Sequence, residues 1–313
     1  MRSAADYLKE QPAYAEVFDG LDDTKLHRGY IEQILTQSEY RDFTRLYRFS
    51  SMKQRKFLDL YFKHYEVEVI KKLLRHMLGG REGQTDLSMF QGFFEKHSEL
   101  DLETLCRAKN FSEFTEALEG TVYGKLLSQM QEKGQTGLFD CELKLDLFYF
   151  QLLWKLRNKL LSKTERKILD DCFGSRLDLL NIQWICRARS FYRLSQAEIY
   201  ALLIPVHYRL RADKVKLLVE AEDDAKFFAV LRETPYGKQE ELQTGQMPDI
   251  QLLSNQMLNR IYGRTGHRYP HSPAVLDSYL YRKELEMRKI VTALEGIRYG
   301  LPASEIMGLL AKQ

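Results

Sequence analysis

The chain has 313 residues, of which 44% are hydrophobic and 29% charged, as in ordinary soluble globular proteins. Its net charge of +3 is too small to indicate general binding to polyanions, and the uncharged run at 147–154 is too short for a membrane-spanning helix. This length can form one large domain or two to three compact units. The first ten residues lack the apolar core of a signal peptide, so we expect a cytoplasmic protein.

Proline usage and apolar spacing predict the secondary structure. No proline occurs between Pro12 and Pro205, so this stretch can hold long uninterrupted helices. Apolar residues recur every three to four positions over 58–73 and again over 287–294, which is typical of helices with one buried face. Because alternating strand patterns are absent, we predict an all-α protein.

Local signals mark where helices begin and end. Ser195 and Glu198 have the spacing of a capping box, in which each side chain binds an amide at a helix start. Turn-forming residues predict breaks between helices at 79–84, 132–137, 243–249 and 262–273. We expect the break at 262–273 to be a surface loop.

A short phrase occurs three times and predicts an internal repeat. It reads LEGTVYG at 118–124, LRETPYG at 231–237 and, more loosely, LKEQPAYA at 8–15. A spacing of about 110 residues is the size of a small domain and too long for a solenoid repeat. We therefore predict three similar helical units, with boundaries at 1–98, 99–209 and 210–313. The first copy is short, and we expect its leading helices to be missing.

The repeated phrase predicts a structural corner between helices. We expect each tyrosine to fill a gap between helices while its hydroxyl binds a backbone group or water. The glycine that follows suits the positive φ of a helix end. A catalytic role is disfavoured, because one chain seldom needs the same reacting residue three times. The corner residues are Tyr14, Tyr123, Tyr236, Thr121, Thr234, Gly124 and Gly237.

A second repeated block carries acidic residues. Segment 65–75 matches 177–187, and the third copy at 283–291 keeps the acid but has Ala293 in place of the arginine. The acids could form a carboxylate or metal site, but we favour structural pairing with the arginines or with nearby lysines. The residues of this block are Glu66, Asp178, Glu284, Arg75 and Arg187. A third block, 192–199, returns at 299–306.

Motifs for cofactors and catalysis are not recognisable. Segment 120–126 contains Gly-Lys but has neither the spacing of a phosphate-binding P-loop nor its Ser or Thr. Histidines and cysteines lack zinc spacing, and no nucleophilic triad has a local signature. We therefore expect no cofactor, no metal and no small-molecule substrate. The cysteines are expected to be free, mostly buried thiols; they are Cys106, Cys141, Cys172 and Cys186.

The repeated blocks resemble a known family. The two TVYG and TPYG corners, segment 177–199 and segment 283–306 are similar to the C subunit of the bacterial and archaeal V-type (A-type) rotary ATPase, which corresponds to the eukaryotic d subunit. The resemblance implies a funnel-shaped, all-helical protein of three units around a pseudo-threefold axis. It also implies a non-catalytic component that links the central stalk to the membrane-embedded rotor ring on the cytoplasmic face and transmits torque. The membrane would be reached only through the ring.

Two other functions remain open at this point. One is an unrelated helical-repeat scaffold that binds protein, or RNA through the basic and aromatic segment 262–271. Such a scaffold would bind polyanions with strong salt dependence. The other is an all-α hydrolase with a dispersed site, which would show turnover as an isolated chain.

Overall fold

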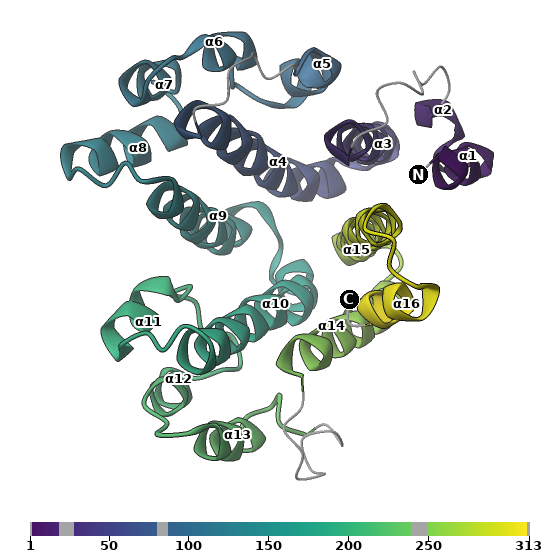
Figure 1. Ribbon diagram of the computed structural model, residues 1–313. Helices are drawn as coiled ribbons and strands as arrows, with labels where there is room; N and C mark the ends of the chain where they lie inside the picture. Colours follow the sequence, from purple (N-terminus) through teal and green to yellow (C-terminus); the bar gives the residue numbers. More distant parts are fainter. Residues whose placement is uncertain (1, 19–27, 80–86, 239–248, 312–313) are drawn as a thin grey trace. The chain divides into compact units, whose positions relative to one another are not determined.

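The computed structural model describes residues 2–18, 28–79, 87–238 and 249–311 (Figure 1). All regular secondary structure in these ranges is helical, which confirms the all-α prediction. The chain divides into two compact units. Unit 1 consists of Met1–Ser50 and Ser162–Gln313, and unit 2 of Ser51–Leu161.

Unit 2 is built on two long helices, α4 and α9, that pack against each other, with shorter helices between them in the chain. Capping explains several of the helix starts. Ser51 and Gln54 form a capping box at α4, and Asp101 and Asn110 cap α6 and α7 through their side chains. The helices are α4 (Met52–Leu78), α5 (Ser88–His97), α6 (Leu102–Arg107), α7 (Phe111–Ala117), α8 (Val122–Glu132) and α9 (Leu138–Leu160).

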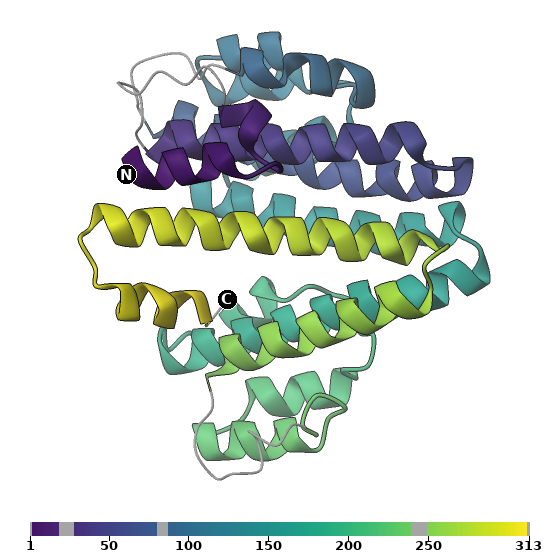
Figure 2. The same ribbon diagram turned by 90° about the vertical axis from the view of Figure 1, so that its right-hand side faces the viewer.

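Unit 1 contains two further pairs of long helices, α10 with α14 and α15 with α3, and α14 also packs against α15. Figure 2 shows α15 as a long helix whose C-terminal end reverses into α16. The helices are α1 (Arg2–Glu10), α2 (Ala15–Phe18), α3 (Arg28–Phe49), α10 (Lys163–Ser190), α11 (Gln196–Leu202), α12 (Ala212–Val219), α13 (Asp224–Arg232), α14 (Ile250–Arg268), α15 (Pro273–Arg298) and α16 (Ala303–Ala311).

Two hydrophobic clusters in unit 1 show which short helices pack against which pair of long helices. One cluster joins α10 and α14 to α12 and α13, through buried side chains such as Ile182, Leu218 and Phe227. The other joins α1, α2 and α3 to Leu294 of α15. The third pair of long helices is therefore formed by elements from the two ends of the described chain.

Some of the predicted helix boundaries are confirmed by the structure and one is wrong. The capping box of Ser195 and Glu198 is confirmed, and the predicted break at 132–137 separates α8 from α9. The breaks at 79–84 and 243–249 fall almost entirely outside the described residues. The surface loop predicted over 262–273 is wrong, because α14 continues to Arg268. Tyr262 is fully buried, stacked on Tyr281 at 4.0 Å, so this apolar contact outweighs the glycines that suggested a loop.

Candidate functional site

The repeated tyrosine of unit 2 binds the repeated acid. Tyr123 is 1% exposed and donates a hydrogen bond from its hydroxyl to Oε2 of Glu66 on α4, at 2.7 Å. Glu66 also accepts from Ser98 Oγ at 2.6 Å and pairs with Lys63 Nζ at 2.9 Å. Burial raises the pKa of the Tyr123 phenol far above its usual value, so it remains a donor. Tyr123 of α8 and Ser98, which follows α5, therefore both contact α4 through Glu66.

The tyrosine of the next copy makes the same contact in unit 1. Tyr236 donates to Oδ2 of Asp178 on α10 at 2.7 Å. Asp178 also accepts backbone N–H groups of Tyr208, Arg209 and Leu210, at 3.1, 2.7 and 2.8 Å. Burial raises the pKa of Asp178 and these hydrogen bonds oppose that effect. The acid therefore holds the 208–210 segment as well as the tyrosine.

Threonine and glycine shape both corners in the same way. Thr121 Oγ1 donates to the Leu118 carbonyl and Thr234 Oγ1 to the Leu231 carbonyl, each at 2.7 Å. At either glycine, a Cβ would lie 2.3 Å from that same carbonyl oxygen. Close approach of backbone to backbone thus excludes any larger residue.

The prediction of a helix end with a positive φ is wrong for these corners. Gly124 lies in the first turn of α8, where Thr121 is the N-cap and accepts from its amide at 3.2 Å. Neither Gly124 nor Gly237 has a positive φ. The hydroxyl of each tyrosine also finds a carboxylate where a backbone group or water was expected.

The first copy of the phrase meets a cation. Tyr14 is 3% exposed, and Lys283 of α15 donates to its hydroxyl at 3.2 Å while lying 4.3 Å from the centre of its ring. Lys283 also pairs with Asp42 of α3 at 3.3 Å, and Tyr279 donates to the same carboxylate at 3.0 Å. The N-terminal segment is therefore held to α15 by a contact between Tyr14 and a buried lysine, with Glu286 and Asp42 also beside the phenol.

The remaining residues of the acidic block bridge helices. Glu284 binds Arg176 of α10 at 3.1 Å and does not meet Tyr14 in the way that the other acids meet their tyrosines. Arg75 of α4 pairs with Glu142 of α9, and Arg187 of α10 donates to Gln251 of α14 at 2.9 Å. Of the two expected partners of the buried acids, a nearby lysine is found at Glu66, and the two arginines bind other residues. Each arginine instead crosses between the two long helices of a pair, while Lys63 neutralises Glu66.

The third repeated block forms a similar turn in both of its copies. Tyr192 and Tyr299 follow α10 and α15 and are 72% and 67% exposed. The next residues, Arg193 and Gly300, have φ values of 51° and 70°. This left-handed step follows the C-terminal end of both long helices.

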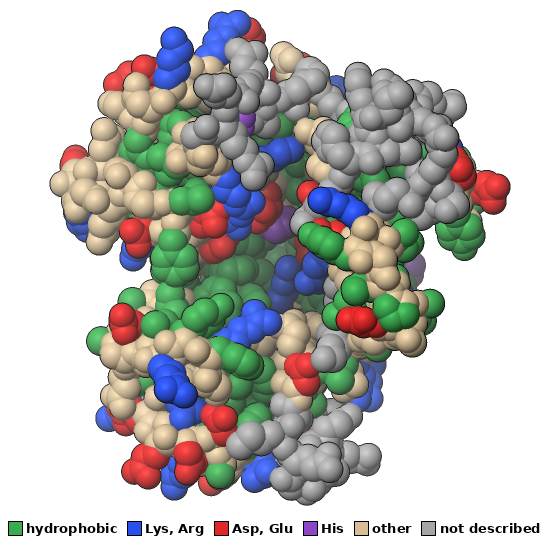
Figure 3. All heavy atoms as spheres, viewed as in Figure 1, with side chains coloured by type: hydrophobic (Ala, Val, Ile, Leu, Met, Phe, Trp, Pro, Cys, Tyr) green, Lys and Arg blue, Asp and Glu red, His purple; other side chains and the backbone are tan. Residues whose placement is uncertain are grey.

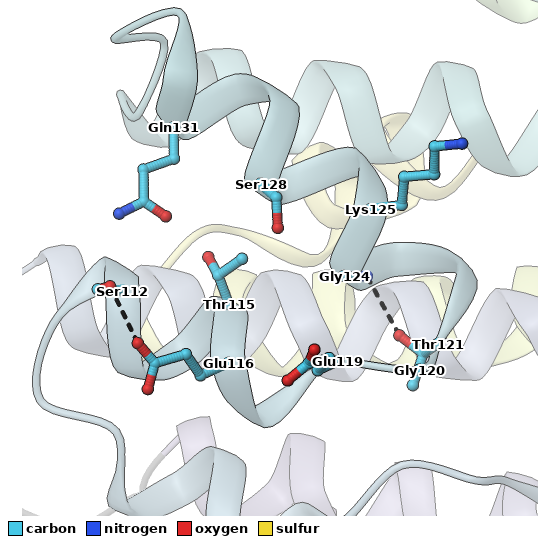
Figure 4. A pocket seen from close by; sticks show the side chains of 10 residues that line it. All are labelled: Ser112, Thr115, Glu116, Glu119, Gly120, Thr121, Gly124, Lys125, Ser128 and Gln131. Atoms are coloured by element: carbon cyan, nitrogen blue, oxygen red, sulfur yellow. Dashed lines mark hydrogen bonds between the residues drawn. The ribbon is translucent and has the colours of Figure 1, made fainter.

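An open hollow of about 560 Å³ lies between α7 and α8, beside the Tyr123 corner (Figure 4). Glu116 and Glu119 line it, and the amide of Gly124 is already bound by Thr121. In Figure 4 Lys125 extends away from Glu116. These carboxylates and the occupied amide disfavour a phosphate group, in agreement with the poor match of this segment to a P-loop.

The structure also bears on metals, membranes and polyanions. Within residues 2–18, 28–79, 87–238 and 249–311, no three His, Cys, Asp or Glu side chains are grouped to hold a metal ion. No helix of the described part combines the length and apolar composition needed to cross a bilayer. Figure 3 shows acidic and basic side chains interspersed on the face it draws. The segment proposed for RNA, 262–271, is mostly helical, with Tyr262 buried.

Sequence reasoning missed two buried lysines. Lys283 completes the contact of the third helix pair, as described above. Lys71 is 8% exposed and joins α4 to α9 by pairing with Asp146 at 2.9 Å and with Glu68 at 3.0 Å. Burial alone would lower the pKa of Lys71, but Glu68 and Asp146 together outweigh it and raise the pKa above its ordinary value. Neither lysine stands out in the sequence, because each has an acid three positions away, as exposed helical lysines often do.

Comparison with known proteins places the chain in a family. A family model described as ATP synthase (C/AC39) subunit matches residues 1–309. The C subunit of the A-type ATP synthase of Methanothermobacter thermautotrophicus is 25% identical over 99% of this chain and 80% of that protein. Its counterpart from Methanosphaera stadtmanae is 22% identical with the same two coverages. That of Pyrococcus abyssi is 27% identical over 67% of this chain and 57% of that protein. Because the family model spans nearly every residue, the chain belongs to the ATP synthase (C/AC39) subunit family.

Proposed function

We propose that this protein is a non-catalytic component of a V-type (A-type) ATP synthase that links the central stalk to the membrane-embedded rotor ring. In this role it transmits torque between the two and neither hydrolyses ATP nor carries ions. It lies on the cytoplasmic face and reaches the membrane only through the ring. The observation that carries the proposal is the family match over residues 1–309.

The contacts of the described residues support a mechanical role. The repeated tyrosines and acids Tyr123, Glu66, Tyr236 and Asp178 are used in buried hydrogen bonds between structural elements. Arginines and lysines cross between long helices at several points. Closely packed interiors of this kind have low compressibility and transmit strain. Such a body is suited to carry a load from one partner to another.

We also propose that the three copies are structurally similar units around a pseudo-threefold axis, giving a funnel. The boundaries 1–98, 99–209 and 210–313 follow from the spacing of the repeated phrase. The tyrosine contacts favour different boundaries for the three repeats, in which each repeat holds one pair of long helices. With these boundaries the third repeat combines α15 and α16 with α1, α2 and α3.

Co-purification tests the partners. We expect the tagged chain to retain the central stalk proteins and the ring when membranes of its own host are solubilised, with each component identified by mass. A variant that combines Tyr123→Phe and Tyr236→Phe removes two buried hydrogen bonds and should weaken this retention. Tyr192→Phe alters an exposed tyrosine and serves as the matched control.

Assays of ATP hydrolysis and of RNA binding test the two alternative functions. The purified chain should show no ATP hydrolysis above that of a heat-denatured sample. Turnover by the isolated chain would favour the hydrolase alternative, and salt-dependent retention on RNA would favour the RNA-binding scaffold. Failure to bind stalk and ring, when a relative of the same family binds them under the same conditions, would refute the proposed role.

A further inference from the structure

A buried carboxyl group lies where three helices of unit 1 meet. Asp277 is in the second turn of α15, which packs here against α10 and α14. The residue is 4% exposed, and its Oδ2 has no hydrogen-bond partner. It differs in this from Asp178, whose oxygens accept four hydrogen bonds.

The surrounding packing leaves little room for the group to rearrange. At Gly266 of α14, a Cβ would lie 2.9 Å from Ser278 Oγ, which in turn donates to the Tyr262 carbonyl at 2.9 Å. Tyr262 and Tyr281 are stacked at 4.0 Å with their planes 5° apart. The helices on either side of Asp277 are therefore held close together.

The charged and titratable groups around Asp277 do not neutralise it. Those that face it are Arg176 and Cys172 on α10, Tyr262 on α14 and Glu284 on its own helix. Arg176 is paired with Glu284 at 3.1 Å, so its charge is already largely compensated. The Tyr262 hydroxyl is buried and also lacks a partner. An ionised carboxylate at this place would therefore keep its buried Oδ2 without a hydrogen-bond donor.

Burial without compensation disfavours the charged form of an acid. Desolvation is the largest cause that raises the pKa of Asp277, to about 7, with Arg176 opposing it and Glu284 adding to it. A neutral carboxyl group can stay in this environment at a lower free-energy cost than a carboxylate.

We propose that Asp277 is a neutral carboxylic acid in the folded protein, and that its ionisation loosens the junction of α10, α14 and α15. The junction then acts as a pH-sensitive element of unit 1. The same helices carry the Arg176–Glu284 and Lys283 contacts, so loosening would reach the attachment of the N-terminal segment.

The direction of the pH effect follows from linkage. The pKa of Asp277 is higher in the folded chain than the ordinary value of 3.8, so the unfolded chain releases this proton first as the pH rises. The stabilising contribution of the Asp277 carboxyl group is fully present when the pH lies below 3.8. It decreases as the pH rises and is lost once the pH exceeds the pKa that Asp277 has in the folded chain. The difference of about 3 pH units corresponds to a loss of up to about a thousandfold in the folding equilibrium.

Urea-induced unfolding of the wild type and of Asp277→Asn between pH 5 and pH 8 tests this. The amide cannot ionise, so the ratio of the folding constants, variant over wild type, should rise by about a hundredfold across this range. Asp213→Asn, which alters an exposed aspartate of α12 in the same unit, should give a constant ratio. A constant ratio for Asp277→Asn as well would overturn the proposal.

A direct measurement remains decisive if the variant does not fold. The carboxyl carbon of Asp277, labelled with ¹³C and assigned through backbone correlations in the wild type, reports its own protonation by its chemical shift. We expect the shift of the protonated form at pH 5 and a change with a midpoint well above the ordinary value of 3.8. A carboxylate shift at pH 5 would refute the proposal.

Discussion

At the scale of single residues, the repeated polar side chains are partners of one another. Tyr123 with Glu66 and Tyr236 with Asp178 place a neutral donor against a buried acid at 2.7 Å. A buried acceptor that loses its partner costs more than the hydrogen bond contributes when both are present. This asymmetry makes the two tyrosines sensitive positions although neither has a role in catalysis.

Removing one tyrosine hydroxyl should therefore lower stability measurably. We expect Tyr123→Phe to reduce the free energy of unfolding by about 1–3 kcal/mol, because Glu66 keeps Ser98 and Lys63 but loses its buried phenol donor. Denaturant titration measures the effect. Tyr192→Phe, at an exposed position, should change stability by less than about 0.5 kcal/mol. Equal effects of the two changes would contradict the structural role assigned to the Tyr123 contact.

At the scale of elements, the corners show that a glycine between two helices can have either of two structural roles. A glycine after a helix usually indicates a left-handed end, as at Gly300. Gly124 instead follows an N-cap threonine, inside the first turn of the next helix, and its role is to admit the Leu118 carbonyl. Both roles select glycine, and only the packing of one helix end on the next distinguishes them.

Substitution of Gly124 tests the role of close approach. Gly124→Ala places a methyl group 2.3 Å from a backbone oxygen, so we expect a loss of about 3 kcal/mol in the free energy of unfolding. Gly92→Ala provides the control, because it is also helical, lies in the same unit and has open space around its Cβ. There we expect a gain of about 0.5–1 kcal/mol, since alanine favours the helix. A tolerated alanine at 124 would show that the backbone can separate at this corner.

At the scale of the whole molecule, the chain is organised by pairs of long helices. Unit 2 is continuous in sequence and holds one pair, whereas unit 1 holds two pairs and is assembled from both sides of unit 2 in the chain. The contact between Tyr14 and Lys283 closes a sequence separation of 269 residues. Contacts this distant contribute late in folding, because long loops must close before they form.

Fragments distinguish the two ways of dividing the chain. Residues 51–161 keep α4 with α9 and Glu66 with Tyr123, so we expect this fragment to give a helical circular dichroism spectrum and cooperative thermal unfolding. Residues 1–98 retain α4 but lose α9 and Tyr123, and should unfold without cooperativity. The reverse result would favour the boundaries predicted from the repeated phrase.

The sequence by itself determined the helical class and the positions of the repeated tyrosines and acids, because apolar spacing, proline placement and recurring phrases are local signals. Only the tertiary structure decided which groups meet. Tyr123 binds an acid 57 residues earlier, Arg75 crosses to α9, and Lys283 binds Tyr14 across a separation of 269 residues. These choices depend on how distant helices pack, and packing also buried Asp277 without a partner for its Oδ2, which no local pattern indicates.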